Sequence, residues 1–211
     1  MASPSRAFTF DRRLARYRDA GTGRLVPATR VRSYLDDALA SAGKRMDALA
    51  NQLRAGQIDV ITWEVRMRRE VKIVSTYSGA LAKGGWAQMT DADYGRVGQY
   101  VRGQYQYLRG FAQRIASGKA PLNGNINNVA RLYAEAGRPL FARMEQVEQV
   151  LRGMTQRLSV KHSLDSCPGC LAAEAAGWHN IAGSTVPEIG ARDCRTRCKC
   201  SWIYRNGEQN G

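Results

Sequence analysis

Apolar residues recur every three or four positions through the middle of the chain, a spacing that predicts amphipathic helices. The first such stripe spans residues 31–53, with Thr29 as the expected N-cap and Gly56 as the expected stop. A second stripe spans residues 60–81 and follows Asp59 directly. Both stretches are therefore expected to be helices with one apolar face.

Two further helical stretches follow. Thr90 and the acidic Asp93 stand at the expected start of a third helix, which continues to Ile115. A fourth stripe begins near Asn125 and resumes after Pro139. Because proline removes a helical hydrogen bond and clashes one turn back, we expect a kink or two abutting helices there.

The third predicted helix contains several interior glycines, Gly95, Gly98, Gly103 and Gly110. Each one costs about 1 kcal/mol of helix stability relative to alanine. Close approach of a neighbouring helix backbone is the expected reason for them.

The short connections between the stripes favour antiparallel neighbours. The expected fold is mainly α, with an antiparallel helical bundle over residues 31–156. Residues 1–30 are expected to form a basic N-terminal arm or a small hairpin, and residues 157–211 a small C-terminal zinc-binding module. No run of about 18 apolar residues and no secretory signal is found, so neither a membrane partner nor export is expected.

The chain is strongly basic, because its 211 residues include 32 Lys and Arg against 18 Asp and Glu, a formal net charge of +14. Such a field attracts polyanions, above all nucleic acid. A basic surface that faces an acidic protein partner is the alternative. The side chains expected to contact nucleic acid or a partner are Arg12, Arg13, Arg16, Arg18, Arg195, Arg197 and Lys199.

All five cysteines lie after residue 160. Cys167 and Cys170 form a CxxC pair on a Pro-Gly turn, and Cys194, Cys198 and Cys200 form a second cluster. Zinc takes four sulfur or nitrogen ligands at tetrahedral corners, and two short-spaced clusters separated by a loop can supply them. The sequence therefore predicts a structural Zn²⁺ held by four of the five thiolates, whose negative charge neighbouring basic side chains offset.

Other interpretations of the cysteines stay open. Disulfides would leave one of the five thiols unpaired and need an oxidising compartment, and unligated thiols are a further alternative. Cys167 and Cys170 would supply two ligands and the second cluster the others, unless His162 or His179 replaces one thiol.

The sequence lacks the common catalytic patterns, such as HExxH, GxSxG and a phosphate-binding glycine loop. A catalytic zinc with an open coordination position would need Glu174 or Glu188 as its base. Four or five available thiolates favour a closed structural site instead. We therefore expect no enzyme and no small-molecule substrate.

The C-terminal end has a recognisable order of residues. It runs from CPxC at Cys167 through Gly177-Trp178 and Pro187-x-x-Gly190 to Cys194 and the Arg-Cys-Lys-Cys run that ends at Cys200. This order resembles the C-terminal end of the minor head proteins, or head-morphogenesis proteins, of tailed bacteriophages and prophages. Features from Leu53 to Tyr133 are similar to the helical part of one branch of that group, so the resemblance covers about residues 30–205.

The resemblance implies a virion component that lies inside the head shell, acts in head assembly and is made in the host cytoplasm. It also implies the portal or the major capsid protein as a partner, with packaged double-stranded DNA as a nonspecific neighbour. Many relatives have a histidine where this chain has Cys194, so the ligand set does not follow from the resemblance. A zinc-containing, sequence-specific DNA-binding regulator is the alternative function.

Overall fold

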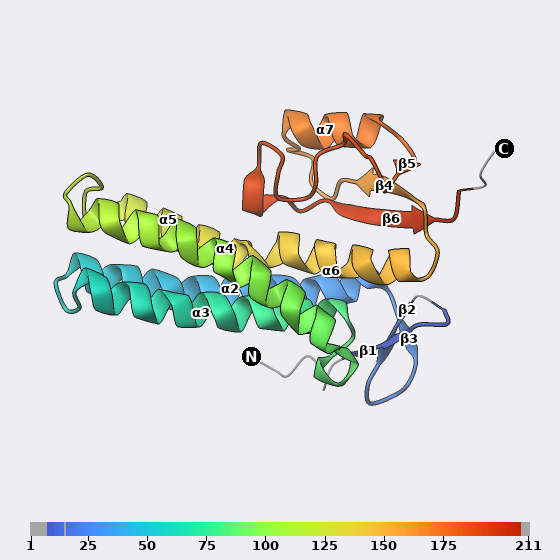
Figure 1. Cartoon of the computed structure of the whole chain (residues 1–211), viewed down its shortest axis with the longest axis horizontal. Helices are drawn as coiled ribbons and strands as arrows, with labels where there is room; N and C mark the ends of the chain where they lie inside the picture. Colours follow the sequence, from blue (N-terminus) through green and yellow to red (C-terminus); the bar gives the residue numbers. More distant parts are fainter. Residues whose placement is uncertain (1–7, 15, 208–211) are drawn as a thin grey trace.

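The computed structural model describes residues 8–14 and 16–207. Most of them lie in helices, namely α2 (Ala28–Arg54), α3 (Val60–Ala82), α4 (Asp91–Ala116), α5 (Gly124–Glu135) and α6 (Gly137–Leu151), with the shorter α7 (Pro168–Ala175) near the C-terminus. The strands are β1 (Phe8–Asp11), β2 (Arg16–Asp19), β3 (Leu25–Val26), β4 (Gln156–Val160), β5 (His179–Asn180) and β6 (Ser201–Arg205). They form two antiparallel sheets, of orders β1-β2-β3 and β5-β4-β6. The expectation of a mainly helical protein is therefore confirmed (Figure 1).

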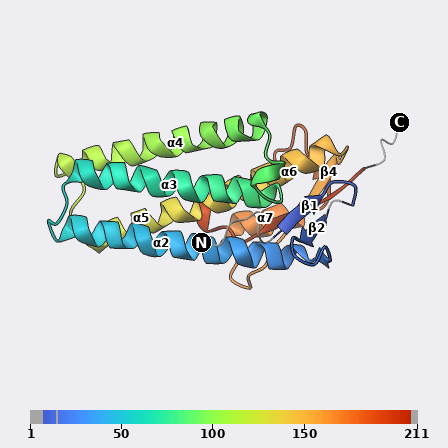
Figure 2. The same ribbon diagram turned by 90° about the horizontal axis from the view of Figure 1, so that it is seen from below.

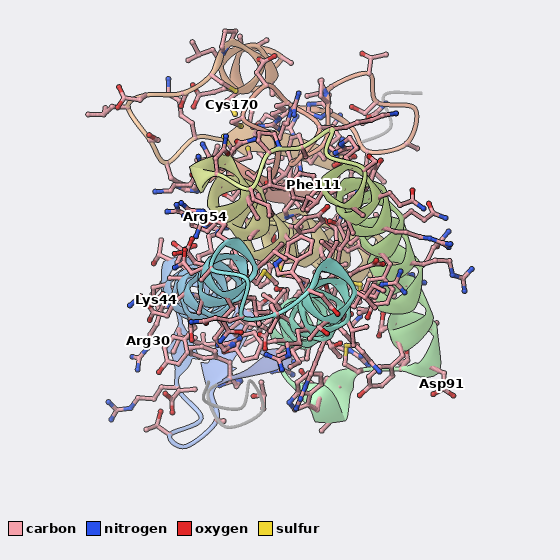
Figure 3. The ribbon with its side chains drawn as sticks, turned by 90° about the vertical axis from the view of Figure 1, so that its left-hand side faces the viewer. Arg30, Lys44, Arg54, Asp91, Phe111 and Cys170 are labelled. Atoms are coloured by element: carbon pink, nitrogen blue, oxygen red, sulfur yellow. The ribbon has the colours of Figure 1, made fainter. Side chains whose placement is uncertain are left out.

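The long helices lie in two layers. Helices α2, α3 and α4 lie side by side in one layer (Figure 2), and α5 and α6, which follow each other nearly in line, pack on α2 and α3. Viewed along these helices, Phe111 points inward, whereas Arg30 and Lys44 lie on the outer side of α2 (Figure 3). Arg54, at the end of α2, reaches Asn127 of α5. The buried core between the layers includes Trp63, Met67, Leu108, Ile126 and Leu140.

Most of the predicted helix boundaries are confirmed. The Asp59 carboxylate accepts a hydrogen bond from the backbone N–H of Thr62 at 2.7 Å, and Thr90 forms a capping box with Asp93. Gly56, with φ of 67°, follows the end of α2 as expected. The prediction of Thr29 as an N-cap is wrong, because α2 begins earlier, at Ala28. The residue before it, Pro27, has the extended backbone of an N-cap but makes no side-chain capping bond.

The fourth helical stripe is two abutting helices, as Pro139 predicted. Helix α5 ends at Glu135 and α6 begins at Gly137, so Pro139 lies in the first turn of α6, where its missing N–H is not needed. Gly137 sits at a close crossing, because a Cβ there would lie 2.5 Å from the Ser78 Oγ. The junction therefore lets α6 pack tightly on α3.

The expected reason for the glycines of α4 is wrong. A Cβ added at Gly95, Gly98 or Gly103 would meet no atom within 4 Å, and one at Gly110 would meet only the Arg114 side chain at 4.0 Å. The close approach between α3 and α4 falls on Gly79 of α3 instead, where a Cβ would lie 2.7 Å from a methyl group of Val97. The α4 glycines thus face open space within this chain.

The basic N-terminal segment forms a hairpin that belongs to the main core, with β1 as an additional strand that the sequence analysis missed. Phe8, Phe10 and Tyr17 are buried against the helices. The backbone N–H and C=O of Phe10 bond to the Gln88 side chain at 2.8 and 3.0 Å, so this side chain pairs with β1 as a strand would. The predicted arm also includes residues 1–7, which lie outside the described residues.

A buried ion network joins this sheet to three helices. Lys83, after α3, forms ion pairs with Asp93 of α4, at 3.4 Å, and with Glu148 of α6. All three side chains are at most 5% exposed. Arg12 reaches Glu148 from the N-terminal sheet, with its Nε 3.2 Å from the carboxylate. Buried charges are stable only when they are paired with opposite charges, so this network holds the N-terminal sheet, α3, α4 and α6 together.

The C-terminal residues cover the outer side of α6 (Figure 1). They include the short helix α7, which ends before Gly177, and the strand β6, which follows Cys200. The two tryptophans of this region have different ring partners. Trp178 lies under the Arg205 guanidinium at 4.4 Å, and the ring of Trp202 lies edge-on to His179, with centroids 5.6 Å apart.

Candidate metal centre

Local structure places the cysteines at the ends of short elements. Cys167 is the N-cap of α7, and Pro168 occupies the first helical position, which suits its fixed φ. The backbone N–H of Cys170 donates to the Cys167 carbonyl at 2.9 Å, which closes the first turn. Cys194 and Cys198 flank the 3-10 turn η2 (Arg195–Arg197), and Cys200 directly precedes β6.

The structure brings all five cysteine side chains into one cluster, hereafter the cysteine cluster. They form two overlapping groups, Cys167 with Cys170 and Cys194, and Cys170 with Cys198 and Cys200. Within each group the sulfur atoms all lie within 4.8 Å of one another. The buried Cys170 belongs to both groups and is the centre of the cluster.

The spacing of the sulfur atoms suits a metal ion. The Sγ of Cys170 lies 3.5 Å from that of Cys194 and 3.6 Å from that of Cys198. Sulfurs about 2.3 Å from a tetrahedral ion lie about 3.8 Å apart, whereas a disulfide needs about 2.05 Å. All five residues are free cysteines, so the cluster has a donor set that can hold a metal ion.

The sulfur atoms perturb one another's protonation. A hydrogen bond from the Cys200 thiol lowers the pKa of Cys198 to about 5. Burial raises the pKa of Cys170 and of Cys194, and the hydrogen bond to Cys198 raises the pKa of Cys200. Part of the cluster is therefore protonated at neutral pH until a cation displaces the protons.

One buried arginine supplies positive charge to the cluster. The Nη1 of Arg192 lies 3.9 Å from the Cys170 Sγ and donates to the Ser159 hydroxyl at 3.0 Å. Arg192, which is 3% exposed, is therefore the nearby basic residue that is placed to offset the negative charge of the sulfur atoms. Arg195, Arg197 and Lys199 are exposed instead and are free to meet a partner.

A hydrogen bond also joins the segment that contains Cys167 and Cys170 to the segment that begins near Cys194. The Asp193 carboxylate accepts a 2.7 Å hydrogen bond from the backbone N–H of Gly169, inside the CxxC turn. A Cβ at Gly169 would lie 2.9 Å from the same carboxylate oxygen. Glycine at this position therefore allows the two segments to meet.

Neither histidine belongs to the two groups of candidate ligands. The His162 Nε2 lies 2.8 Å from the Ser201 hydroxyl. The His179 Nδ1 lies 3.0 Å from the Gly177 carbonyl, and its Nε2 accepts a hydrogen bond from Arg157 at 3.2 Å. Both rings thus have partners away from the sulfur atoms.

Arg157 is a structural residue of the site that sequence reasoning missed. Its side chain is 1% exposed, and its Nη1 lies 2.7 Å from both carboxylate oxygens of Glu188. Its guanidinium lies over the Trp202 ring, 4.0 Å from the centroid. Only the alternation of β4, with Arg157 on the buried face, could have indicated it.

The two carboxylates considered as bases are held in ion pairs. Glu174 lies 2.9 Å from Lys161, and Glu188 pairs with Arg157 as described. Glu174 has its pKa lowered, chiefly by the hydrogen bond from Lys161. A carboxylate stabilised in its charged form is a weak base.

The basic residues predicted for partner contact divide between two places. Arg12 and Arg18 are held in ion pairs with Glu148 and Asp11, whereas Arg13 and Arg16 are exposed. The N-terminal sheet lies near the end of α6, while η2 contacts α5 and the start of α6 (Figure 1). The structure therefore does not bring the two sets of basic residues together.

Comparison of the chain with protein-family models, curated proteins and solved structures found no match. Within residues 8–14 and 16–207, none of the helices combines the length and the apolar character needed to cross a bilayer.

Proposed function

We propose that the cysteine cluster holds one structural Zn²⁺, bound by four of the five thiolates. A set of soft sulfur donors at tetrahedral spacing favours Zn²⁺ over hard cations such as Mg²⁺ and Ca²⁺. Cys170 belongs to both sulfur groups, so we expect it in the ligand set. Four protein thiolates would leave no coordination position for water, and the ion would stabilise the fold without taking part in catalysis.

On this basis we propose that the chain is a structural minor head protein of a tailed bacteriophage, with a helical bundle and a zinc module. It would lie inside the head shell and act in head assembly through the portal or the major capsid protein. The proposal rests mainly on the order of the C-terminal motif from Cys167 to Cys200, whose cysteines converge on one place.

The net charge of +14 supports a position next to packaged DNA. Such a protein gains affinity by releasing counterions from phosphates, without reading the base sequence. Exposed Arg13 and Arg16, at one end of the molecule, are available for this contact.

The direct test is incorporation into head shells. The chain is produced together with the portal and major capsid proteins of a tailed bacteriophage from the same source, and purified shells are analysed for its presence. We expect a few copies per shell, a clear loss with Cys170→Ser, and no loss with Thr185→Ala at an exposed position of the same region. A folded, zinc-loaded chain that stays out of the shells would contradict the proposal.

A sequence-specific DNA-binding regulator is the second candidate, because the positive charge suits it equally well. Binding to duplexes of different sequence at a fixed salt concentration separates the two functions. The head-protein function predicts binding that falls steeply with salt and does not depend on sequence. Strong discrimination between duplexes would favour the regulator.

A further inference from the structure

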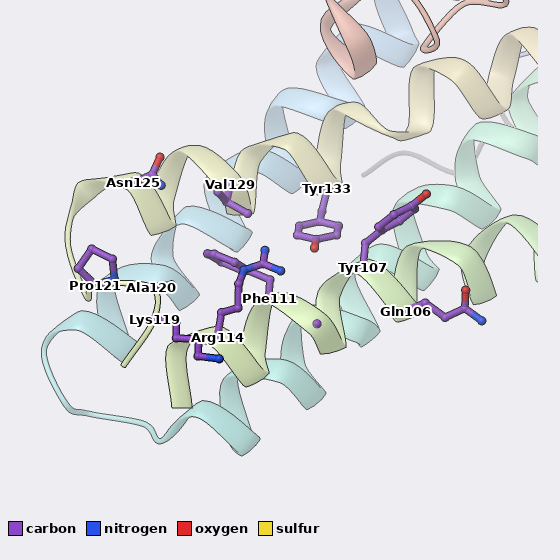
Figure 4. A pocket seen from close by; sticks show the side chains of 11 residues that line it. Gln106, Tyr107, Phe111, Arg114, Lys119, Ala120, Pro121, Asn125, Val129 and Tyr133 are labelled. Carbon is purple, nitrogen blue, oxygen red and sulfur yellow. The ribbon is translucent and has the colours of Figure 1, made fainter. Parts of the chain in front are cut away.

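A long groove separates α4 from α5 and α6. It consists of two adjoining hollows of about 960 and about 480 Å³, both lined by Tyr107, Val129 and Tyr133. Along α4 the groove runs from Arg96 to Arg114, which corresponds to about 27 Å at 1.5 Å per residue. This length matches about five turns of a partner helix. Figure 4 shows the smaller hollow, between the end of α4 and the start of α5.

The floor of this α4 groove is apolar and partly uncovered. The half-buried side chains of the floor are Val129, Leu132 and Val147, and the buried Leu140, Met144 and Ile189 lie beneath its surface. Tyr107 projects from α4 with 72% of its surface exposed. A large aromatic side chain beside an apolar floor is typical of a surface that binds another protein.

The rim of the groove is positive. Its cationic side chains are Arg96, Arg143, Arg195, Arg114 and Lys119, and within residues 8–14 and 16–207 no carboxylate lines either hollow. Arg143 lies over the Tyr100 ring at 5.5 Å, and Arg114 over the Phe111 ring at 5.4 Å, so these cations are held at the groove. Among the residues that the structure describes, only Arg96 of this set is in an ion pair. The rim therefore has positive charge available for acidic groups.

Two of the α4 glycines lower the wall of the groove. Gly103 lines the larger hollow and Gly110 the smaller one. They are seven residues apart, on the same side of the helix. Packing within the chain does not require either glycine, since added Cβ atoms would meet nothing nearer than 4.0 Å. Small residues at these positions let another backbone come close.

We propose that the α4 groove binds an amphipathic helix of another protein, with apolar side chains on the floor and acidic side chains against the rim. A second copy of this chain fits poorly, because it brings another net charge of +14. Duplex DNA would match the rim, but its phosphates would find no partners on the apolar floor. Binding of such a helix does not depend on the proposed role in head assembly, so the two can fail separately.

The probe is a synthetic 20-residue helical peptide with leucines on one face and glutamates elsewhere, and affinity for the full chain is measured by fluorescence anisotropy. Filling the groove with Gly103→Leu and Gly110→Leu should weaken binding about tenfold or more, while the helix itself gains stability. The matched control is Gly95→Leu with Gly98→Leu, on α4 but outside the groove lining. The Kd of this control variant for the peptide should lie within about twofold of the Kd of the unmodified chain.

A charge pair completes the test. Arg114→Glu with Arg143→Glu should weaken binding about tenfold, whereas Arg102→Glu with Arg109→Glu, on the far side of α4, makes the same change in net charge and should have little effect. Equal losses of peptide affinity in the two double variants would overturn the proposal. A peptide with lysines in place of the glutamates that bound the unmodified chain as tightly as the original peptide would also overturn it. The proposal would also be overturned if duplex DNA or a second copy of this chain displaced the peptide from the unmodified chain, and if that competitor no longer bound the variant with Gly103→Leu and Gly110→Leu.

Discussion

Replacing Arg157 with methionine is expected to loosen the C-terminal sheet from α6. Methionine keeps much of the side-chain volume but removes the charge and every donor. The Nη1 loses its hydrogen bond to the Gln146 side chain of α6 and its 2.7 Å contacts with Glu188. The Nε loses its 3.2 Å bond to His179, and the 4.0 Å stacking on Trp202 disappears. The substitution therefore isolates the contribution of one buried cation.

The expected cost follows from these contacts. A hydrogen bond to a charged group contributes about 1.5–3 kcal/mol, and a desolvated cation–π contact contributes about 2 kcal/mol. Because Glu188 is 39% exposed, water replaces part of the ion pair, and its contribution must be discounted. We expect a loss of about 3 kcal/mol in the free energy of unfolding, or a fall of roughly 6–12 °C in Tm.

The assay is urea unfolding of the metal-loaded chain, followed by tryptophan fluorescence and circular dichroism. Arg205→Met is the matched control, since this exposed arginine also stacks on a tryptophan, Trp178, at 4.4 Å. It should lose less than about 1 kcal/mol. An equal effect of the two substitutions, or an Arg157→Met variant as stable as the unmodified chain, would refute the reasoning.

Three other perturbations test the packing of the helical part. Lys83→Met leaves the buried carboxylates of Asp93 and Glu148 without their shared cation, and we expect a loss of about 3–5 kcal/mol in unfolding experiments. Burial raises the pKa of Asp93, but hydrogen bonds and the Lys83 charge outweigh it and hold that pKa below its usual range. The contribution of Asp93 is therefore complete above about pH 4 and is lost as the pH falls through the lowered pKa, so Asp93→Asn should make stability less sensitive to acid. Gly84→Ala should destabilise far more than Gly56→Ala: both glycines have positive φ, but only at Gly84 does an added Cβ collide with backbone, at 2.2 Å. Comparable losses at the two glycines in thermal unfolding would contradict that explanation.

The helices could be predicted from the sequence because their signals are local. The apolar spacing, the caps at Asp59 and Thr90 and the interruption at Pro139 all act within a few residues. The strand β1 was missed because it has only four residues, and because the Gln88 side chain, which bonds its backbone in addition to β2, lies far away in the sequence.

The α4 glycines show where local reasoning fails. An interior glycine indicates that something is unusual at that position, but the sequence does not say which helix lies opposite it. The structure places the tight crossings at Gly79 and Gly137 and leaves Gly103 and Gly110 in open space. Which residue meets which across a fold depends on the relative placement of whole elements.

The cysteine cluster was predictable in composition but not in arrangement. The spacing of Cys167 and Cys170 indicated one half of a metal site, and the second cluster indicated the other. The shared position of Cys170 and the contact from Arg192 depend on how η2 and β4 meet α7, which spacing along the chain does not encode.

X-ray absorption spectroscopy combined with metal analysis of the purified chain tests the central claim most directly. We predict one zinc ion per chain, surrounded by four sulfur atoms at about 2.3 Å. A chain that is folded but metal-free after purification in the presence of zinc, or a zinc ion with oxygen or nitrogen in place of the sulfur atoms, would contradict the claim.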